Sequence, residues 1–182
     1  MDNTKYFLLI IICFAMLVCS KHPIILSGNT MGTTYSVKIL DENGIINNQV
    51  LLQSKIDSLL NLINQHLSTY INNSEINRFN QKESTQPFLA SPILIEVLQK
   101  AIYHYNLSKG SFDITVGPLV EAWGFSSDTN HFNTPNSNII DSLLIHSGSD
   151  KLLIDQLFIY KKDADIKIDM SAIEKGWGVD QI

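Results

Sequence analysis

Hydrophobic and polar positions alternate or recur in helical turns along most of the chain, and these patterns predict its elements. The segment TTYSVKIL alternates apolar Tyr35, Val37 and Ile39 with polar neighbours, which is the period of a half-buried strand. The segment 49–67 carries apolar side chains on one helical face and therefore predicts a long amphipathic helix. That face consists of Leu52, Ile56, Leu59, Leu60, Ile63 and Leu67.

Capping residues mark the starts of the next helices. Ser74 is a suitable N-cap for one short helical turn within STYINNSEINRFN. Ser91 followed by Pro92 opens a second long helix in the usual order of cap and first-turn proline, and Gly110 ends it. The pattern predicts a third helix over residues 137–146.

The last quarter of the chain changes to short apolar runs joined by polar turns. Residues 151–155, 157–161 and 166–170 predict three short strands of a meander. A further helix is predicted to begin near Ser171. Helices and strands that are not regularly interleaved favour an α+β fold, here predicted as a mixed sheet with packed helices.

The N-terminal segment reads as a targeting signal. An uncharged apolar run at residues 6–18 follows Lys5 and is too short for a comfortable membrane span. We therefore expect residues 1–19 to be a signal peptide and residues 20–27 to be a tether. The domain proper is expected to occupy residues 28–182.

Cys19 ends the apolar run and suggests a lipoprotein signal, in which this cysteine is acylated. Val18 stands where such signals prefer a small residue, so an ordinary signal peptide or an uncleaved anchor stays open as the alternative. The expected location is the periplasmic face of a bacterial inner membrane, with a lipid anchor on Cys19. Both cysteines lie in this leader, so the exported part has no thiolate metal ligand and no disulfide.

Composition narrows the class of partner. The hydrophobic fraction of 45% and charged fraction of 17% are those of a globular domain. The net charge of -5 makes a nucleic-acid partner unexpected. The five histidines form no HExxH pair and no GxSxG elbow is present, so the sequence indicates neither a zinc hydrolase nor a serine hydrolase.

Asp113 is the first candidate for chemistry, within GSFDITVGPLVEAWGF. Gly110 and the Gly117–Pro118 pair allow tight turns around it, so its carboxylate could face a cleft. The alternative is an aspartate that braces a turn through local hydrogen bonds. From composition alone, the bracing role is favoured over a carboxylate that faces a cleft.

A strand-to-helix corner is the second candidate, within IDMSAIEKGWGVD. Free backbone N–H groups at such a corner suit a phosphate, and Lys175 could reach it as a point charge. The alternative is that Ser171 caps the helix and Lys175 is solvated. The loop GNTMGTTY is a third and weaker candidate, because it matches neither a Walker loop nor a Rossmann turn.

In this order and spacing, the segments GNTMGTTYSVKI, LSTYINNSEINRFN, GSFDITVGPLVEAWGF and IDMSAIEKGWGVD resemble the ApbE family of FAD:protein FMN transferases. The resemblance implies that FAD is contacted by Met31, Tyr70, Ser111, Phe112, Asp113, Asp169 and Lys175. It implies a Mg²⁺ position at Ala172, necessarily through the backbone carbonyl because this side chain offers no ligand.

The resemblance also implies an activity: transfer of FMN from FAD to a threonine hydroxyl of a partner protein, with release of AMP. Implied acceptors are subunits of quinone reductases and related electron-transfer complexes. The alternatives are an exported FAD-binding protein, a FAD pyrophosphatase and an inactive remnant. The family's late Asp/Thr metal motif has no counterpart in these residues, so we expect an N-terminal part of a longer protein.

Overall fold

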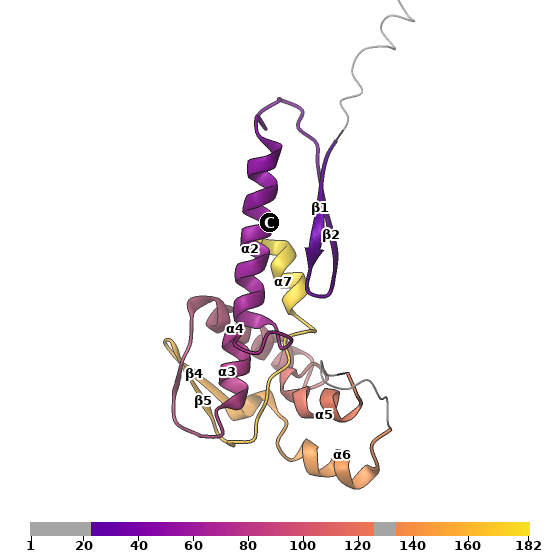
Figure 1. The fold of residues 1–182 in the computed structure, drawn as a ribbon. Coiled ribbons are helices and arrows are strands. Elements are labelled where there is room, and N and C mark those ends of the chain that lie inside the picture. The colour runs from indigo at the N-terminus through magenta and orange to yellow at the C-terminus, as the bar shows by residue number, and fades with distance from the viewer. Residues whose placement is uncertain (1–22, 126–133) are drawn as a thin grey trace, which may run out of the picture.

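A long helix and a β-hairpin form one end of the protein, and shorter helices with a small sheet form the other (Figure 1). The structure is a computed structural model that describes residues 23–125 and 134–182. Its helices are α2 (Gln49–Leu67), α3 (Glu75–Gln81), α4 (Pro92–Leu107), α5 (Gly117–Ala122), α6 (Ser137–Leu144) and α7 (Glu174–Gln181), with 3-10 helices η1 (Ile114–Val116) and η2 (Ser149–Lys151). Its strands are β1 (Ile24–Thr30), β2 (Thr33–Ile39), β3 (Phe88–Leu89), β4 (Leu152–Asp155) and β5 (Phe158–Lys161).

The hairpin of β1 and β2 is antiparallel along the whole length of both strands. The turn residues Met31 and Gly32 both have positive φ, 50° and 68°, as a two-residue type I′ turn requires. The strand predicted from the alternating pattern is confirmed as β2. β1 was not predicted, and it includes residues 24–27 of the segment assigned above to a tether.

Tyr35 fastens the hairpin to α2. Its hydroxyl donates to the carboxylate of Asp57 and accepts from the side-chain amide of Gln53. Its ring covers Gly28, the residue opposite it on β1, where an added Cβ would lie 2.7 Å from Tyr35 Cε1. An aromatic ring on a cross-strand glycine fixes the register of the hairpin against the helix.

The helices follow their predicted caps and faces. α2 spans the predicted residues, and four of the six predicted stripe positions are buried. The Ser74 hydroxyl accepts from Asn77 N at 3.2 Å at the start of α3, and the Ser91 hydroxyl accepts from Leu94 N at 3.2 Å at the start of α4. The buried core lies where α2, α3, α4 and β5 meet; its fully buried large side chains include Ile63, Leu67, Ile76, Phe79, Leu94, Leu98, Ile159 and Ile168.

The second sheet has the order β3-β5-β4, with both pairings antiparallel. The α+β class is thus confirmed, but the described strands form two separate antiparallel sheets in place of one mixed sheet. The strand predicted at 166–170 is also wrong. Ile166, Ile168 and Met170 are buried in alternation as a strand would be, yet the backbone there bonds to a side chain and a loop and joins no sheet.

Within the described ranges, no helix combines the length and the apolar character needed to cross a membrane. The predicted signal peptide and Cys19 lie outside the described residues.

Candidate functional site

The corner between the extended segment 166–170 and α7 is held by its own backbone. Asp169 N donates to Ile114 O at 2.8 Å, which ties the corner to the segment around Asp113. The Asp169 carboxylate accepts from Ser171 N at 2.7 Å, the bond of a tight Asx turn. Residues 169–178 therefore form a fixed corner between an extended segment and a helix. A corner was predicted from IDMSAIEKGWGVD, but the segment before it is not a strand.

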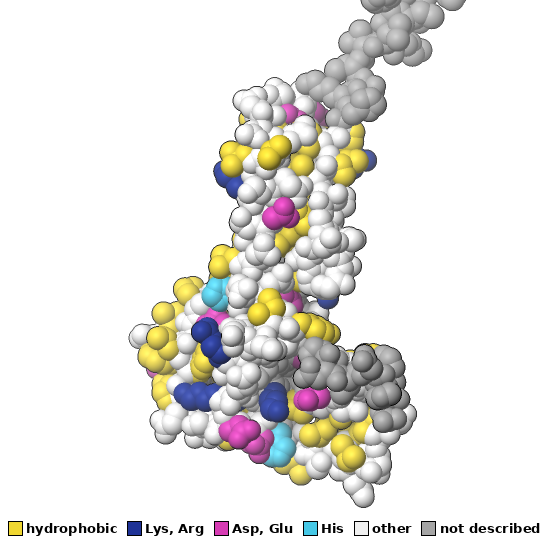
Figure 2. Space-filling model, viewed as in Figure 1, with side chains coloured by type: hydrophobic (Ala, Val, Ile, Leu, Met, Phe, Trp, Pro, Cys, Tyr) yellow, Lys and Arg dark blue, Asp and Glu magenta, His cyan; other side chains and the backbone are white. Residues whose placement is uncertain are grey.

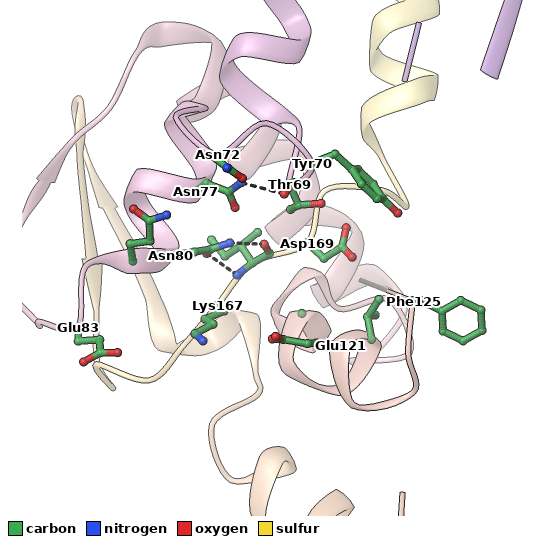
Figure 3. Close-up of a pocket in the computed structure, with 14 residues that line it drawn as sticks. Thr69, Tyr70, Asn72, Asn77, Asn80, Glu83, Glu121, Phe125, Lys167 and Asp169 are labelled. Carbon is green, nitrogen blue, oxygen red and sulfur yellow. Dashed lines mark hydrogen bonds between the residues drawn. The ribbon is translucent and has the colours of Figure 1, made fainter. Parts of the chain in front are cut away.

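A hollow of about 400 Å³ opens on one side of this corner (Figure 3). We call it the amide pocket because asparagine side chains supply much of its lining. It brings together two of the predicted FAD residues, Tyr70 and Asp169. Its other lining residues are Thr69, Asn72, Asn77, Asn80, Gln81, Glu83, Gly117, Val120, Glu121, Phe125, Lys167 and Ile168.

Two of the pocket amides hold its walls in place (Figure 3). Asn80 accepts from Ile168 N and donates to Ile168 O, both at 2.8 Å, so its side chain pairs with the segment 166–170 as a strand would. The Asn77 amide donates to Thr69 O at 2.8 Å and to Ile71 O at 2.9 Å, which shapes the loop that carries Tyr70. These amides orient the backbone of the pocket.

Gly117 allows a close approach between α5 and the corner. A Cβ added there would lie 3.1 Å from Lys167 O, closer than side chains normally come to a carbonyl. The glycine in VGP therefore serves contact between two backbones and does not adopt a left-handed conformation. A tight turn was predicted at Gly117–Pro118, but in the structure η1 is followed there directly by α5.

Two further hollows lie along the corner. The groove between α4 and α7, of about 460 Å³, is lined by the predicted residues Phe112 and Ala172. The hollow at the hairpin turn, of about 400 Å³, contains Met31. Met31 also packs against Gly178 of α7, at the other end of the corner from Asp169. The four resembling segments thus meet around residues 169–178, but only four of the seven predicted FAD residues line these hollows. Tyr70 and Asp169 line the amide pocket, Phe112 the groove and Met31 the hollow at the hairpin turn.

One carboxylate oxygen of Asp113 is used in hydrogen bonds within the protein and does not face a cleft. The Oδ1 atom accepts from Thr115 N at 2.9 Å, from Thr115 Oγ1 at 2.7 Å and from Ser149 Oγ at 2.6 Å. Thr115 and Ser149 are fully buried. The brace left open above is therefore what this carboxylate does here, and it fixes η1 onto η2. Ser111 is exposed and lines none of the three hollows.

Charge at the start of α7 is divided between a buried and an exposed residue. Lys175 is exposed, whereas Glu174 is buried, and its Oε1 has no hydrogen-bond partner among the described residues. Burial raises the pKa of Glu174 to about 7; the charge of Asp169 adds to the rise and Lys175 opposes it. Sequence reasoning did not single out Glu174, because no local signal tells a buried glutamate in a helical turn from a solvated one.

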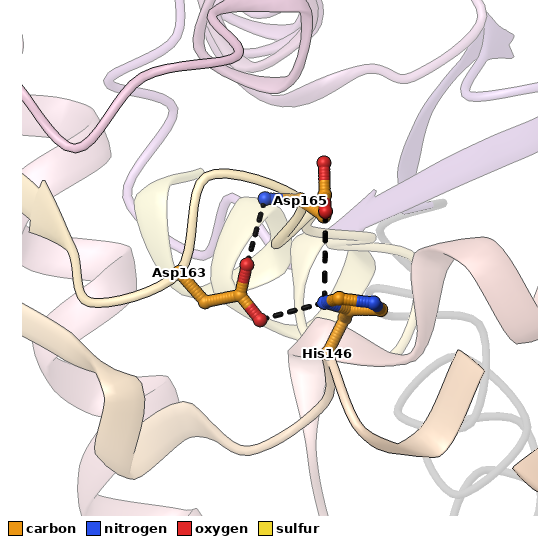
Figure 4. A group of neighbouring side chains, drawn as sticks. All are labelled: His146, Asp163 and Asp165. Carbon is orange, nitrogen blue, oxygen red and sulfur yellow. Dashed lines mark hydrogen bonds and ion pairs between the residues drawn. The ribbon is translucent and has the colours of Figure 1, made fainter. Parts of the chain in front are cut away.

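Two other polar clusters lie away from the corner. His146 Nδ1 contacts Asp163 Oδ2 at 2.6 Å and lies 3.8 Å from Asp165 Oδ2, which joins the end of α6 to the turn after β5 (Figure 4). The hydrogen bond from Asp165 N and, to a smaller extent, the one to His146 lower the pKa of Asp163. This arrangement is a side-chain contact that closes a turn.

His66, Glu75 and Ser91 form the second cluster. Glu75 Oε2 and Ser91 Oγ both approach the same His66 atom, Nδ1, at 2.5 Å and 3.1 Å. In a catalytic triad the serine and the orienting acid bond to opposite ring nitrogens of the histidine base. The cluster therefore joins α2, α3 and α4 and does not have the geometry of a catalytic triad.

Solved flavin transferases share this fold. The structure of "Flavin Transferase ApbE from Vibrio cholerae" superposes with a TM-score of 0.83 at 38% identity, over 88% of this chain and 52% of that one. The apo form of Pseudomonas stutzeri flavinyl transferase ApbE gives a TM-score of 0.81 at 27% identity, over 87% and 52%.

Sequence comparison gives the same result. The FAD:protein FMN transferase of Vibrio cholerae is 39% identical over 157 residues, which cover 86% of this chain and 47% of that protein. The Haemophilus influenzae enzyme of the same name is 34% identical over 175 residues, covering 92% and 51%. A family model, described as the ApbE family, matches residues 31–182. The chain belongs to the ApbE family, and it spans about half the length of these relatives.

Proposed function

We propose that this chain supplies the FAD-binding part of an FAD:protein FMN transferase. The observation that carries the proposal is the meeting of four separated segments around residues 169–178, on a chain of the ApbE family. The proposed reaction moves FMN from FAD to a threonine hydroxyl of a partner protein and releases AMP. The names of the Vibrio and Haemophilus relatives support it.

The bonds exchanged define what the site has to do. The threonine oxygen attacks the phosphorus on the FMN side of the FAD diphosphate, and the bond from that phosphorus to the bridging oxygen breaks. AMP leaves with the bridging oxygen, and the threonine proton passes to solvent or a base. The diphosphate must therefore be held in line with the acceptor while its charge is balanced.

Residues at the corner fit parts of this task. Tyr70 is 64% exposed on the rim of the amide pocket and offers a ring face for stacking on a flat nucleotide ring. Lys167, just before the corner, and Lys175, within it, are exposed cations suited to a diphosphate. Met31 would supply an apolar contact at the hairpin turn.

Residues just before α7 and at its first position also offer ligands of the kind that magnesium prefers. The Ala172 carbonyl, the Asp169 carboxylate and the unpartnered Oε1 of Glu174 are all oxygen donors close together in the chain. Oxygen-only sets suit Mg²⁺. A bound ion would neutralise the diphosphate charge.

We also propose that the protein is exported and held at the periplasmic face of the inner membrane by a lipid on Cys19. The apolar run at 6–18 and the position of Cys19 support this location. A membrane-bound acceptor, such as a subunit of a quinone reductase, would then share its compartment.

The test is an incubation of this chain with FAD, Mg²⁺ and a threonine-bearing acceptor domain. Flavin fluorescence on the denatured acceptor together with AMP would establish transfer. AMP without labelled acceptor would assign a pyrophosphatase, and FAD binding without AMP would assign a binding protein. A chain that does not bind FAD would overturn the proposal.

A further inference from the structure

Aliphatic side chains gather at the end of the molecule where the N-terminal segment joins the fold. We call this group the apolar rim; it consists of Leu40, Ile45, Val50 and Leu51. Val50 and Ile45, at 80% and 73% exposure, are the two most exposed large hydrophobic side chains among the described residues. Figure 2 shows hydrophobic side chains at this end.

Hydrogen bonds fix the loop and helix turn that present the rim. Both carboxylate oxygens of Asp41 accept backbone N–H groups, from Ile45 at 2.8 Å and from Ile46 at 3.0 Å. Asn48 caps α2 by accepting from Leu51 N at 2.8 Å. The rim is therefore displayed by a built turn and a capped helix. All four rim side chains are exposed.

The position of β1 places the rim next to the predicted anchor. Ile24, the first residue of β1, pairs with Ile39, and Leu40 follows directly. Because β1 begins at Ile24, the link from Cys19 is five residues and reaches at most about 17 Å. A lipid on Cys19 would therefore hold this end of the molecule against the headgroup region of a bilayer, which is itself several ångströms deep.

We propose that the apolar rim inserts into the lipid bilayer interface beside the anchor. The inference rests on the proposed membrane anchoring but not on FMN transfer. The occupant is a zwitterionic lipid surface, because the rim is aliphatic and the charged residues of its loop, Asp41 and Glu42, are acidic. A polybasic contact with anionic lipid would need the opposite charge.

Docking by the rim orients the site. α2 runs from the rim toward the amide pocket, and its 19 residues span about 28 Å (Figure 1). The pocket would then stand that far above the membrane surface. Acceptor segments that project from the membrane could reach it there. A flexibly tethered enzyme would have no fixed height.

The experiment uses the chain with its N-terminal segment, isolated from bacterial membranes and reconstituted in phosphatidylcholine vesicles. Ile45→Trp is compared with Leu153→Trp, an exposed position on β4 at the opposite end, after subtraction of the parent fluorescence. Lipids brominated on the upper acyl chain should quench the tryptophan at 45 several-fold more than the tryptophan at 153. Acrylamide should show the reverse order.

Each other outcome overturns the proposal. Vesicle-bound chain with equal bromolipid quenching at both positions would mean an anchored body that does not dock. A tryptophan at 45 shielded from both lipid and acrylamide would mean that protein covers the rim. Chain that does not float with vesicles would overturn both the anchor and the rim, while FMN transfer, measured separately by flavin labelling, would be unaffected.

Discussion

Met31, at the tip of the hairpin, lies directly against Gly178 of α7. A Cβ added at Gly178 would be 3.3 Å from Met31 Cε and 3.7 Å from Ile63 Cδ1. The hairpin, α2 and α7 therefore meet at a point where a side chain larger than hydrogen has to displace its neighbours. This contact links the first and last of the four family segments.

Replacing Gly178 should separate these elements. We expect Gly178→Leu to lower the free energy of unfolding by about 1–3 kcal/mol, the usual range for overpacking. Denaturant titration followed by tryptophan fluorescence would measure the change. In the same helix, no atom of the described residues outside the helix backbone lies within 4 Å of a Cβ added at Gly176, so Gly176→Ala should raise stability by about 0.5–1 kcal/mol. Equal effects at the two glycines would show that the contact with Met31 does not exist.

Asn80 replaces a missing strand partner, so its loss should loosen the pocket wall. Asn80→Leu leaves Ile168 N and Ile168 O without partners and should cost about 2 kcal/mol or more. Asn80→Asp keeps the acceptor for Ile168 N and should cost less. Amide hydrogen exchange at Ile168 should accelerate strongly in Asn80→Leu and to a smaller degree in Asn80→Asp. Unchanged exchange in Asn80→Leu would contradict this bonding.

Substitutions of Asp113 can distinguish a bracing role from a role in nucleotide binding. Asp113→Asn keeps the oxygen that accepts the three hydrogen bonds from Thr115 and Ser149. If bracing is the role of Asp113, this variant should retain near-normal stability. Asp113→Ala should lower the free energy of unfolding by about 1–3 kcal/mol. Ser149→Ala should give part of that loss. FAD affinity measured on Asp113→Asn then isolates the carboxylate charge; a large drop without loss of stability would restore a direct nucleotide role.

The sequence predicted elements whose signals are local. The cap residues Ser74 and Ser91 and the apolar stripe of α2 each act within a few turns, and all three were confirmed. β1 was not predicted because IILSGNT alternates weakly, and its pairing depends on a hairpin turn at Met31 and Gly32. The segment 166–170 carries a strand pattern, but a distant side chain, Asn80, takes the place of the ladder.

The same distinction between local signals and tertiary contacts applies to the candidate site. The corner after Asp169 is visible in the sequence because an extended apolar run changes to a helical pattern there. The closeness of Gly117 to Lys167, the amide supports and the burial of Glu174 all depend on tertiary contacts between segments up to 88 residues apart. No spacing rule within one segment reports such contacts.

Glu174 should make stability fall as the pH rises toward neutrality. Its folded pKa of about 7 lies above the unfolded value of 4.5, so the folded protein binds more protons between these values. By linkage, the free energy of unfolding decreases from about pH 4.5 to pH 7, here by about 1–3 kcal/mol from this group. Glu174→Gln should remove that part of the slope in urea titrations repeated across this range.

A surface carboxylate provides the matched control for that slope. Asp155 is exposed on β4, and Asp155→Asn, which also removes one carboxylate, should still show the slope that Glu174 produces over the same interval. A Glu174→Gln profile that runs parallel to the parent chain would show that Glu174 is solvated or paired in the folded protein.

Tyr70 and Tyr103 offer the sharpest test of the amide pocket, because they match in exposure and differ in position. Their exposed fractions are 64% and 63%, but only Tyr70 lines the pocket. A ring that stacks on a nucleotide contributes about 0.5–1.5 kcal/mol, so Tyr70→Ala should weaken FAD binding by roughly two- to tenfold. Tyr103→Ala should leave FAD binding unchanged, and neither variant should alter the unfolding midpoint, because both rings are already largely in water. Flavin fluorescence titration gives the dissociation constants. Equal affinities for the two variants would place the flavin nucleotide outside the amide pocket and shift the site toward the groove that contains Phe112 and Ala172.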